Sequence, residues 1–179
     1  KILQTDSQVS PISGSIKEQI VTFVGTEKIK QYGESHGIIN TFDHEIVNRV
    51  VATYQEQVSG ELISEFPSYW RVESRAPGHE WHYDGCKLEG GIFVDNHMPW
   101  CQYGSTILLS DMGEFTGGQL YLNIDETVLE VTDSYLTGII YTAGKTNNPV
   151  KHMVTPHVGS RTVLLIFFTT EEYKNENLS

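Results

Sequence analysis

The last two-thirds of this chain consists of short strand-like segments separated by turn-forming residues. The turns carry glycine, proline and asparagine, as in Ala76-Pro77-Gly78 and Asn147-Asn148-Pro149. No helical pattern alternates with the strands as it does in βαβ units, so the sequence predicts an all-β core, either a sandwich or a jelly roll, with flanking helices (an α+β arrangement). The predicted strands are Tyr69–Arg75, Glu80–Tyr83, Ile92–Asp95, Ser105–Ser110, Gln119–Leu122, Val128–Val131, Tyr135–Tyr141, Val150–Thr155 and Arg161–Thr169.

The first third of the chain has helical patterns instead. Ser15 is a candidate N-cap for a helix from Ile16 to Val24, and Asp43 for a second helix through Tyr54, with Gly60 as its stop. The length predicts a single domain over residues 1–179. We expect residues 1–61 to be a mostly helical support, residues 62–170 to be the β core, and residues 171–179 to be a polar tail.

Charge and hydropathy exclude several classes of partner. The net charge is −11, and most of the acidic excess lies after residue 60, which disfavours a nucleic-acid substrate. The longest apolar run, Val163–Phe168, has the length of a strand and not of a membrane span. No secretory signal is visible, so we expect a cytoplasmic protein without a membrane partner. The oligomeric state is open.

The two cysteines, Cys86 and Cys101, flank a segment that is long for a strand connection. A disulfide between them would clamp that segment, but nothing else indicates an oxidising compartment, so two free thiols are favoured. Long loops on a rigid scaffold commonly form lids or recognition surfaces. Glu89 and Asp95 within the segment suggest a cationic substrate, and an ordinary solvated loop face explains them as well.

Three residues form a candidate metal site. His82 and Asp84 are two apart on a predicted strand, so their side chains point to the same face, and Gly85 lets the chain turn away after them. A third ligand has to come from another strand, and His152 lies in a suitable extended segment. Two histidines and one carboxylate are the facial triad of non-haem Fe(II), while the same set could hold zinc for hydrolysis.

Other histidines compete for these roles. His79 and His82 have a spacing that suits a helix, but Pro77-Gly78 argues against a helix here. His157 is an alternative distal ligand to His152. Nine residues after His152 stands Arg161, a fixed cation that suits an anionic cosubstrate.

The order of these motifs resembles the 2-oxoglutarate- and Fe(II)-dependent oxygenases, and most closely their prolyl 4-hydroxylase-like branch. The resemblance covers residues 66–170. Its motifs are Trp81-His82-Tyr83-Asp84-Gly85, a Gly-Gly hairpin in Phe115–Leu122, His152-x-Val154-x-Pro156, and Gly159-Ser160-Arg161. That family has a basic residue about nine positions after its distal histidine, which selects His152 over His157.

The resemblance implies a double-stranded β-helix (jelly roll) that hydroxylates a C–H bond of an amino-acid or peptidyl substrate, prolyl residues included. His82, Asp84 and His152 would hold Fe(II). 2-Oxoglutarate would pair its far carboxylate with Arg161 and leave as succinate and CO₂, and ascorbate is a candidate reductant. Retention of Asp84 favours hydroxylation, because related halogenating sites replace that carboxylate with a small residue.

The sequence departs from the family pattern at two positions. Leu108 stands where a tyrosine usually contacts the oxoglutarate, and Ser74 and Arg75 stand near the position of another tyrosine. Tyr103 or Thr106 could supply a replacement contact. Arg75 is a candidate for binding a substrate carboxylate, with a surface ion pair as the alternative.

Two other classes of function remain open at this point. One is a zinc-dependent jelly-roll hydrolase or isomerase, for which neither oxoglutarate nor Arg161 would matter. The other is a non-catalytic metal-binding module of the same fold, which would tolerate the loss of a ligand.

Overall fold

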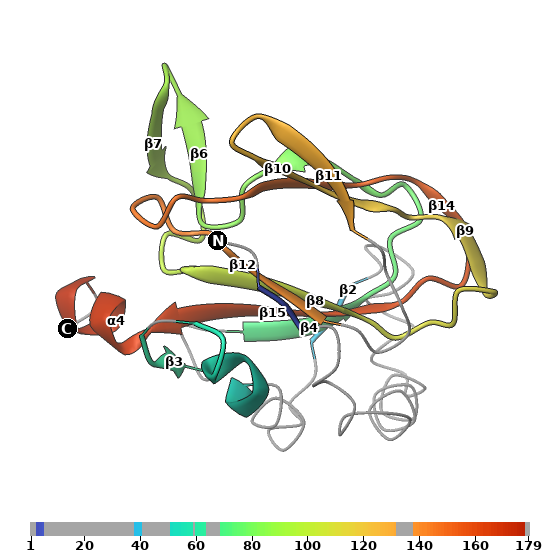
Figure 1. Ribbon diagram of the computed structural model, residues 1–179, viewed down its shortest axis with the longest axis horizontal. Coiled ribbons are helices and arrows are strands. Elements are labelled where there is room, and N and C mark those ends of the chain that lie inside the picture. Colours follow the sequence, from blue (N-terminus) through green and yellow to red (C-terminus); the bar gives the residue numbers. More distant parts are fainter. Residues whose placement is uncertain are drawn as a thin grey trace.

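The computed structural model describes residues 3–5, 38–40, 51–58, 60–63, 69–131 and 138–177. The described part is built almost entirely from antiparallel strands, arranged in two facing layers (Figure 1). None of its helices is long and apolar enough to cross a membrane.

The larger layer is a seven-stranded sheet in the order β1-β12-β8-β15-β4-β2, with β3 paired to the end of β15. The long strand β15 lies at its centre and pairs with β8 on one side and β4 on the other. The strands are β1 (Leu3–Thr5), β12 (Gly138–Thr142), β8 (Tyr103–Leu108), β15 (Val163–Thr170), β4 (Tyr69–Glu73), β2 (Ile38–Asn40) and β3 (Leu62–Ile63).

The second layer lies above this sheet in Figure 1. It contains a four-stranded sheet in the order β11-β10-β13-β5 and a two-stranded ladder of β14 and β9. Its strands are β5 (His79–His82), β10 (Leu120–Ile124), β11 (Thr127–Val131), β13 (Lys151–Val154), β9 (Phe115–Gly117) and β14 (His157–Gly159).

A separate hairpin of β6 (Cys86–Glu89) and β7 (Ile92–Asp95) projects from the body beside the second layer (Figure 1). Its two-residue turn is Gly90-Gly91, and both residues have positive φ, as a tight hairpin turn requires. A short helix α4 (Glu171–Asn177) follows β15 directly.

The central strands are buried on both faces, which explains their nearly continuous apolar sequence. Along β15, Val163, Leu165 and Phe167 face the space between the layers. The alternate residues face the other way, where the ring of Phe168 meets Tyr54 edge-on with centroids 6.2 Å apart. Each such large buried side chain contributes about 1.5–3 kcal/mol to stability, so β15 anchors both the outer packing and the wall of the inner space.

The structure confirms a mostly β, antiparallel core and differs from the sequence prediction in detail. The segment from Cys86 to Gln102 is not simply a long connection, because β6 pairs with β7 and forms a hairpin within it. The sequence patterns also missed the short strands β3, β9 and β14. They missed β1 and β2 as well, two strands of the larger sheet that lie within the predicted helical support of residues 1–61. Residues 51–55 are helical, and the remainder of both predicted N-terminal helices lies outside the described residues. Cys86 and Cys101 are free and buried.

Candidate metal centre

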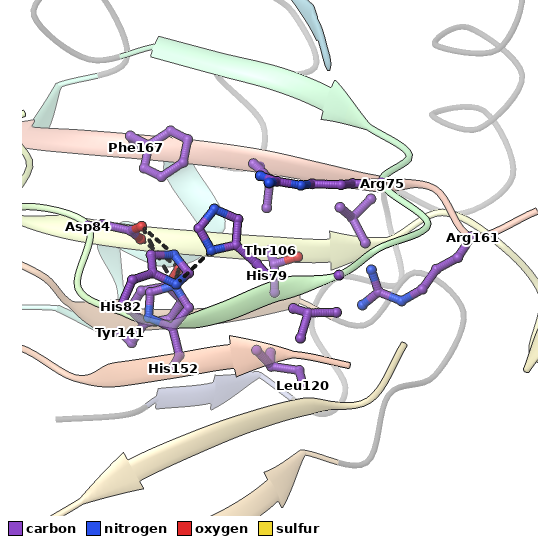
Figure 2. A pocket seen from close by; sticks show the side chains of 14 residues that line it. Arg75, His79, His82, Asp84, Thr106, Leu120, Tyr141, His152, Arg161 and Phe167 are labelled. Carbon is purple, nitrogen blue, oxygen red and sulfur yellow. Dashed lines mark hydrogen bonds and ion pairs between the residues drawn. The ribbon is translucent and has the colours of Figure 1, made fainter. Parts of the chain in front are cut away.

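Strand pairing brings the three candidate ligands together. In the β13–β5 ladder His152 lies directly opposite His82, and Asp84 follows two residues after His82. The Nε2 atoms of His82 and His152 lie 3.5 and 3.6 Å from the same carboxylate oxygen, Asp84 Oδ1. One donor atom of each residue lies within 4.8 Å of the others (Figure 2). This group could hold a metal ion.

Backbone carbonyls orient both imidazoles. His82 Nδ1 lies 2.7 Å from the carbonyl of Glu80, and His152 Nδ1 lies 3.2 Å from the carbonyl of Val150. A carbonyl can only accept, so each Nδ1 carries the proton and each Nε2 presents its lone pair toward Asp84. Hydrogen bonds of this kind fix the tautomer and direction of metal-ligating histidines. The donor set is therefore arranged as a metal site requires.

Tyr141, on β12, is a member of the site that the sequence analysis missed. Its hydroxyl donates to Asp84 Oδ2 at 2.8 Å and lies 3.3 Å from His152 Nε2. This hydrogen bond uses Asp84 Oδ2. The other oxygen of the carboxylate, Oδ1, lies nearest both histidines and remains available to a cation.

Gly104 makes room for this arrangement. On β8, opposite Tyr141, a Cβ at this position would lie 2.5 Å from Asp84 Oδ2 and 2.6 Å from the Tyr141 ring. A side chain at position 104 would therefore displace either the carboxylate or the ring.

Burial sets the protonation states of the site. It lowers the pKa of His152 to about 4, against smaller opposing effects from Asp84, so this imidazole is neutral at pH 7. Burial raises the pKa of Asp84, but His152, His82 and the Tyr141 hydroxyl together outweigh it and hold that pKa below its usual range. An ionised carboxylate beside a neutral imidazole is the state that binds a divalent cation. At neutral pH the contact between Asp84 and His152 is therefore not an ion pair.

The three residues lie at one end of a pocket between the two layers, and Arg161 lies at the other end (Figure 2). Arg161 is 6% exposed, and its guanidinium carbon lies 5.9 Å from the centroid of the Phe115 ring. Gly118, at φ +71°, allows this side chain to pass, since a Cβ there would lie 2.3 Å from Arg161 Cδ. The sequence analysis placed Gly117-Gly118 in a hairpin, but the strands that it joins do not pair with each other: β9 pairs with β14, and β10 pairs with β11 and β13. Gly118 instead leaves the space that the arginine side chain occupies.

Tyr103 and Thr106, the two other residues predicted to contact the cosubstrate, lie on opposite faces of β8. Thr106 lines the pocket between the metal-ligand cluster and Arg161 (Figure 2). Leu108 points the same way but packs into an apolar cluster with Phe115 and Val163. Tyr103 is three residues from Thr106 and faces away, toward a depression beside α4. The structure does not bring Tyr103 together with the other site residues.

The competing histidines have distinct positions. His79 lines the pocket, and its Nδ1 lies 2.9 Å from His82 Nδ1, on the side of the ring away from Asp84. His157, on β14, is buried beside Phe115, with ring centroids 6.5 Å apart, and it is absent from the pocket wall. His152 is the distal histidine that meets His82 and Asp84.

No family model matches the sequence, and no curated protein sequence matches it. Solved structures do match its fold. A prolyl hydroxylase from Trichoplax adhaerens, in complex with a hypoxia inducible factor oxygen degradation domain peptide fragment, is 11% identical with a TM-score of 0.61, covering 99% of this chain and 86% of that one. A viral collagen prolyl hydroxylase from Paramecium Bursaria Chlorella virus-1 is 13% identical with a TM-score of 0.60, covering 94% and 89%.

A third match is an oxidoreductase of the 2OG-Fe(II) oxygenase family from Burkholderia pseudomallei. It is 14% identical with a TM-score of 0.47, and the match covers 85% of this chain and only 57% of that one. The two stronger matches cover nearly the whole of both chains. The chain therefore has the fold of the prolyl hydroxylases.

Proposed function

We propose that this protein is an Fe(II)- and 2-oxoglutarate-dependent dioxygenase that hydroxylates a C–H bond of an amino-acid or peptidyl substrate. The observation that carries the proposal is the convergence of His82 Nε2, His152 Nε2 and Asp84 Oδ1 in a pocket whose far end holds Arg161. In this proposal residues 62–170 are a double-stranded β-helix within a single domain, and the fold similarity to prolyl hydroxylases supports that assignment.

The donor chemistry fits iron. Two imidazole nitrogens and one carboxylate oxygen on one side of an ion leave the remaining positions open to cosubstrate and oxygen. When bound, Fe(II) supplies the oxygen chemistry that converts 2-oxoglutarate to succinate and CO₂ and hydroxylates the substrate. The protein orients the ligands: Glu80 and Val150 carbonyls hold the imidazoles and Tyr141 holds the carboxylate.

Arg161 is the proposed anchor for the far carboxylate of 2-oxoglutarate. A planar guanidinium binds a carboxylate through two parallel hydrogen bonds and keeps its charge at any physiological pH. Its burial strengthens the pairing, because the charges meet in a site with little water. Thr106, on the wall between Arg161 and the ligand cluster, is the proposed hydroxyl contact in place of the family tyrosine that Leu108 replaces.

The test is anaerobic addition of Fe(II) and 2-oxoglutarate to the purified protein. We expect a weak visible charge-transfer band in the wild type and its loss in His152→Ala. On admission of air, succinate should form, and a gain of one oxygen should appear in the substrate by mass spectrometry. A zinc hydrolase or isomerase would show neither the band nor succinate. Absence of the band in the wild type, or its persistence in His152→Ala, refutes the proposal.

A further inference from the structure

The pocket contains a second guanidinium, Arg75, which the proposed iron and oxoglutarate chemistry does not use. Arg75 is exposed and lies at the edge of this pocket, whereas Arg161 is buried at the end opposite the metal-ligand cluster. Figure 2 shows both arginines on the same side of the ligand cluster, with Arg75 nearer to His79.

A rigid turn holds Arg75 in place. The amide of Gly78 donates to the Arg75 carbonyl at 3.0 Å and closes the turn between β4 and β5, and the amide of His157 donates to Ala76 at 2.8 Å. Gly78 has φ +73° and packs so tightly on β13 that a Cβ would lie 2.3 Å from the carbonyl of Val154. The backbone of Arg75 is therefore fixed at the pocket edge, while its side chain stays accessible.

The charges in the pocket leave Arg75 unbalanced. This step rests on the proposed function. Fe(II) and Arg161 together carry three positive charges, and Asp84 with the two carboxylates of 2-oxoglutarate carries three negative charges. The two histidine ligands add no charge, because an imidazole binds a metal in its neutral form. Arg75 is not part of this balance, and one added negative charge would offset it.

No acid within the described part of the chain forms an ion pair with Arg75. The two acids of the β6–β7 hairpin that suggested a cationic substrate are themselves paired. Glu89 Oε1 lies 2.7 Å from Lys87 Nζ, and Asp95 Oδ2 lies 2.7 Å from Lys145 Nζ. Both acids of the hairpin are thus offset by lysines, so they give no support to a cationic substrate.

We propose that the prime substrate carries a free carboxylate and that Arg75 binds it at the pocket edge, so that the substrate is an amino acid with its carboxylate free. The guanidinium fork matches a carboxylate, and a monoanion matches the single unbalanced charge. A phosphate ester carries more charge than the site leaves unbalanced. Arg75 is a specificity residue in this proposal.

The test compares acids with their amides. Wild-type enzyme with Fe(II), 2-oxoglutarate and oxygen is incubated with each of the common L-amino acids and with each corresponding carboxamide, and succinate formation is measured against the rate without substrate. We expect at least one acid to stimulate succinate formation, with a preference over its carboxamide of roughly 10- to 100-fold in kcat/KM, the range for a charged hydrogen bond.

Arg75→Gln should reduce that acid-to-amide preference to near unity, mainly by raising the KM for the acid. Arg75→Lys keeps the positive charge but loses the paired hydrogen-bond donors of the guanidinium. Its acid-to-amide preference should therefore lie between those of the wild type and Arg75→Gln. Lys87→Gln removes the same charge from the exposed hairpin, outside the pocket wall, and should retain the wild-type preference.

Three results overturn the inference: a preference that survives in Arg75→Gln, equal stimulation by acids and amides, or no stimulation by any acid. A rise in the KM for 2-oxoglutarate rather than for the acid in Arg75→Gln also overturns it, because Arg75 would then serve the cosubstrate. Failure of the proposed function looks different, since the wild type would then show neither the anaerobic visible band nor succinate.

Discussion

Removal of the Tyr141 hydroxyl tests whether this buried tyrosine orients the metal-binding carboxylate. Tyr141 and Asp84 are 3% and 9% exposed, and the hydroxyl donates to Oδ2 at 2.8 Å. A hydrogen bond to a charged group is worth about 1.5–3 kcal/mol, and its loss here leaves a buried carboxylate oxygen without this donor. We therefore expect Tyr141→Phe to lower the unfolding free energy of the metal-free protein by about that amount.

The same substitution should weaken metal binding. Loss of a group that orients a metal ligand typically lowers affinity by about 10- to 100-fold. Anaerobic calorimetric titration with Fe(II) measures this effect, and urea unfolding of the metal-free protein measures the stability change.

Tyr121→Phe is a matched control, because it also removes a tyrosine hydroxyl that donates to a carboxylate. The Tyr121 bond to Glu130 Oε2 is 3.0 Å long but lies on the surface, so we expect a change within about 0.5 kcal/mol and unaltered metal affinity. Equal effects of the two substitutions would refute the reasoning. A loss of stability in Tyr141→Phe with unchanged metal affinity would show that the hydroxyl supports the fold and does not orient Oδ1.

Three further outcomes are expected. Gly104→Ala places a methyl group 2.5 Å from Asp84 Oδ2 and should displace that carboxylate. Metal affinity measured by calorimetry should then fall by roughly 10- to 100-fold, as when a group that orients a metal ligand is lost; unchanged affinity would mean that the strand yields instead. Arg161→Ala should raise the KM for 2-oxoglutarate roughly 100-fold and leave the Fe(II) requirement much less affected; equal effects would make Arg161 structural. Burial lowers the pKa of His152 to about 4, so as the pH falls the unfolded chain takes up the proton before the folded chain does. The unfolding free energy of the metal-free protein should therefore fall by up to about 1.4 kcal/mol per pH unit from about pH 6.5 down to about pH 4. His152→Leu should flatten that slope, as measured by urea unfolding.

Alternation along a strand led the sequence analysis to put His82 and Asp84 on one face. In the structure β5 ends at His82, and Asp84 lies in the bend that follows, with its carboxylate 3.5 Å from the His82 imidazole. The same rule separates Tyr103 from Thr106, which are three residues apart and lie on opposite faces of β8. Thr106 is two residues from Leu108, the position of the family tyrosine, and so shares its face of the strand. Of the two candidates, Thr106 was therefore the better choice from the sequence. The Gly90-Gly91 pair likewise signals a tight hairpin turn, from which β6 and β7 could have been predicted.

Tyr141 could not be found in this way, because its role depends on contacts between distant strands. It is 57 residues from Asp84 in the sequence, and the two side chains meet only because β12 pairs with β8 so that Tyr141 lies opposite Gly104. A shift of that register by one residue would turn the Tyr141 ring to the other face of the sheet. Propensity and spacing within one segment contain no information about this register.

The ligand set depends on register in the same way. His152 meets His82 because the two residues are opposite each other in the β13–β5 ladder, and the ladder shifts register immediately afterwards, between His152 and Val154. A bulge of this kind bends a strand and redirects its side chains, and it is commonly found beside functional sites. Gly78 packs against Val154 at the same irregularity and also closes the turn that carries Arg75. The bulge thus couples the position of the metal ligands to that of the proposed substrate-binding arginine, so a substitution at Gly78 should disturb metal affinity and acid preference together.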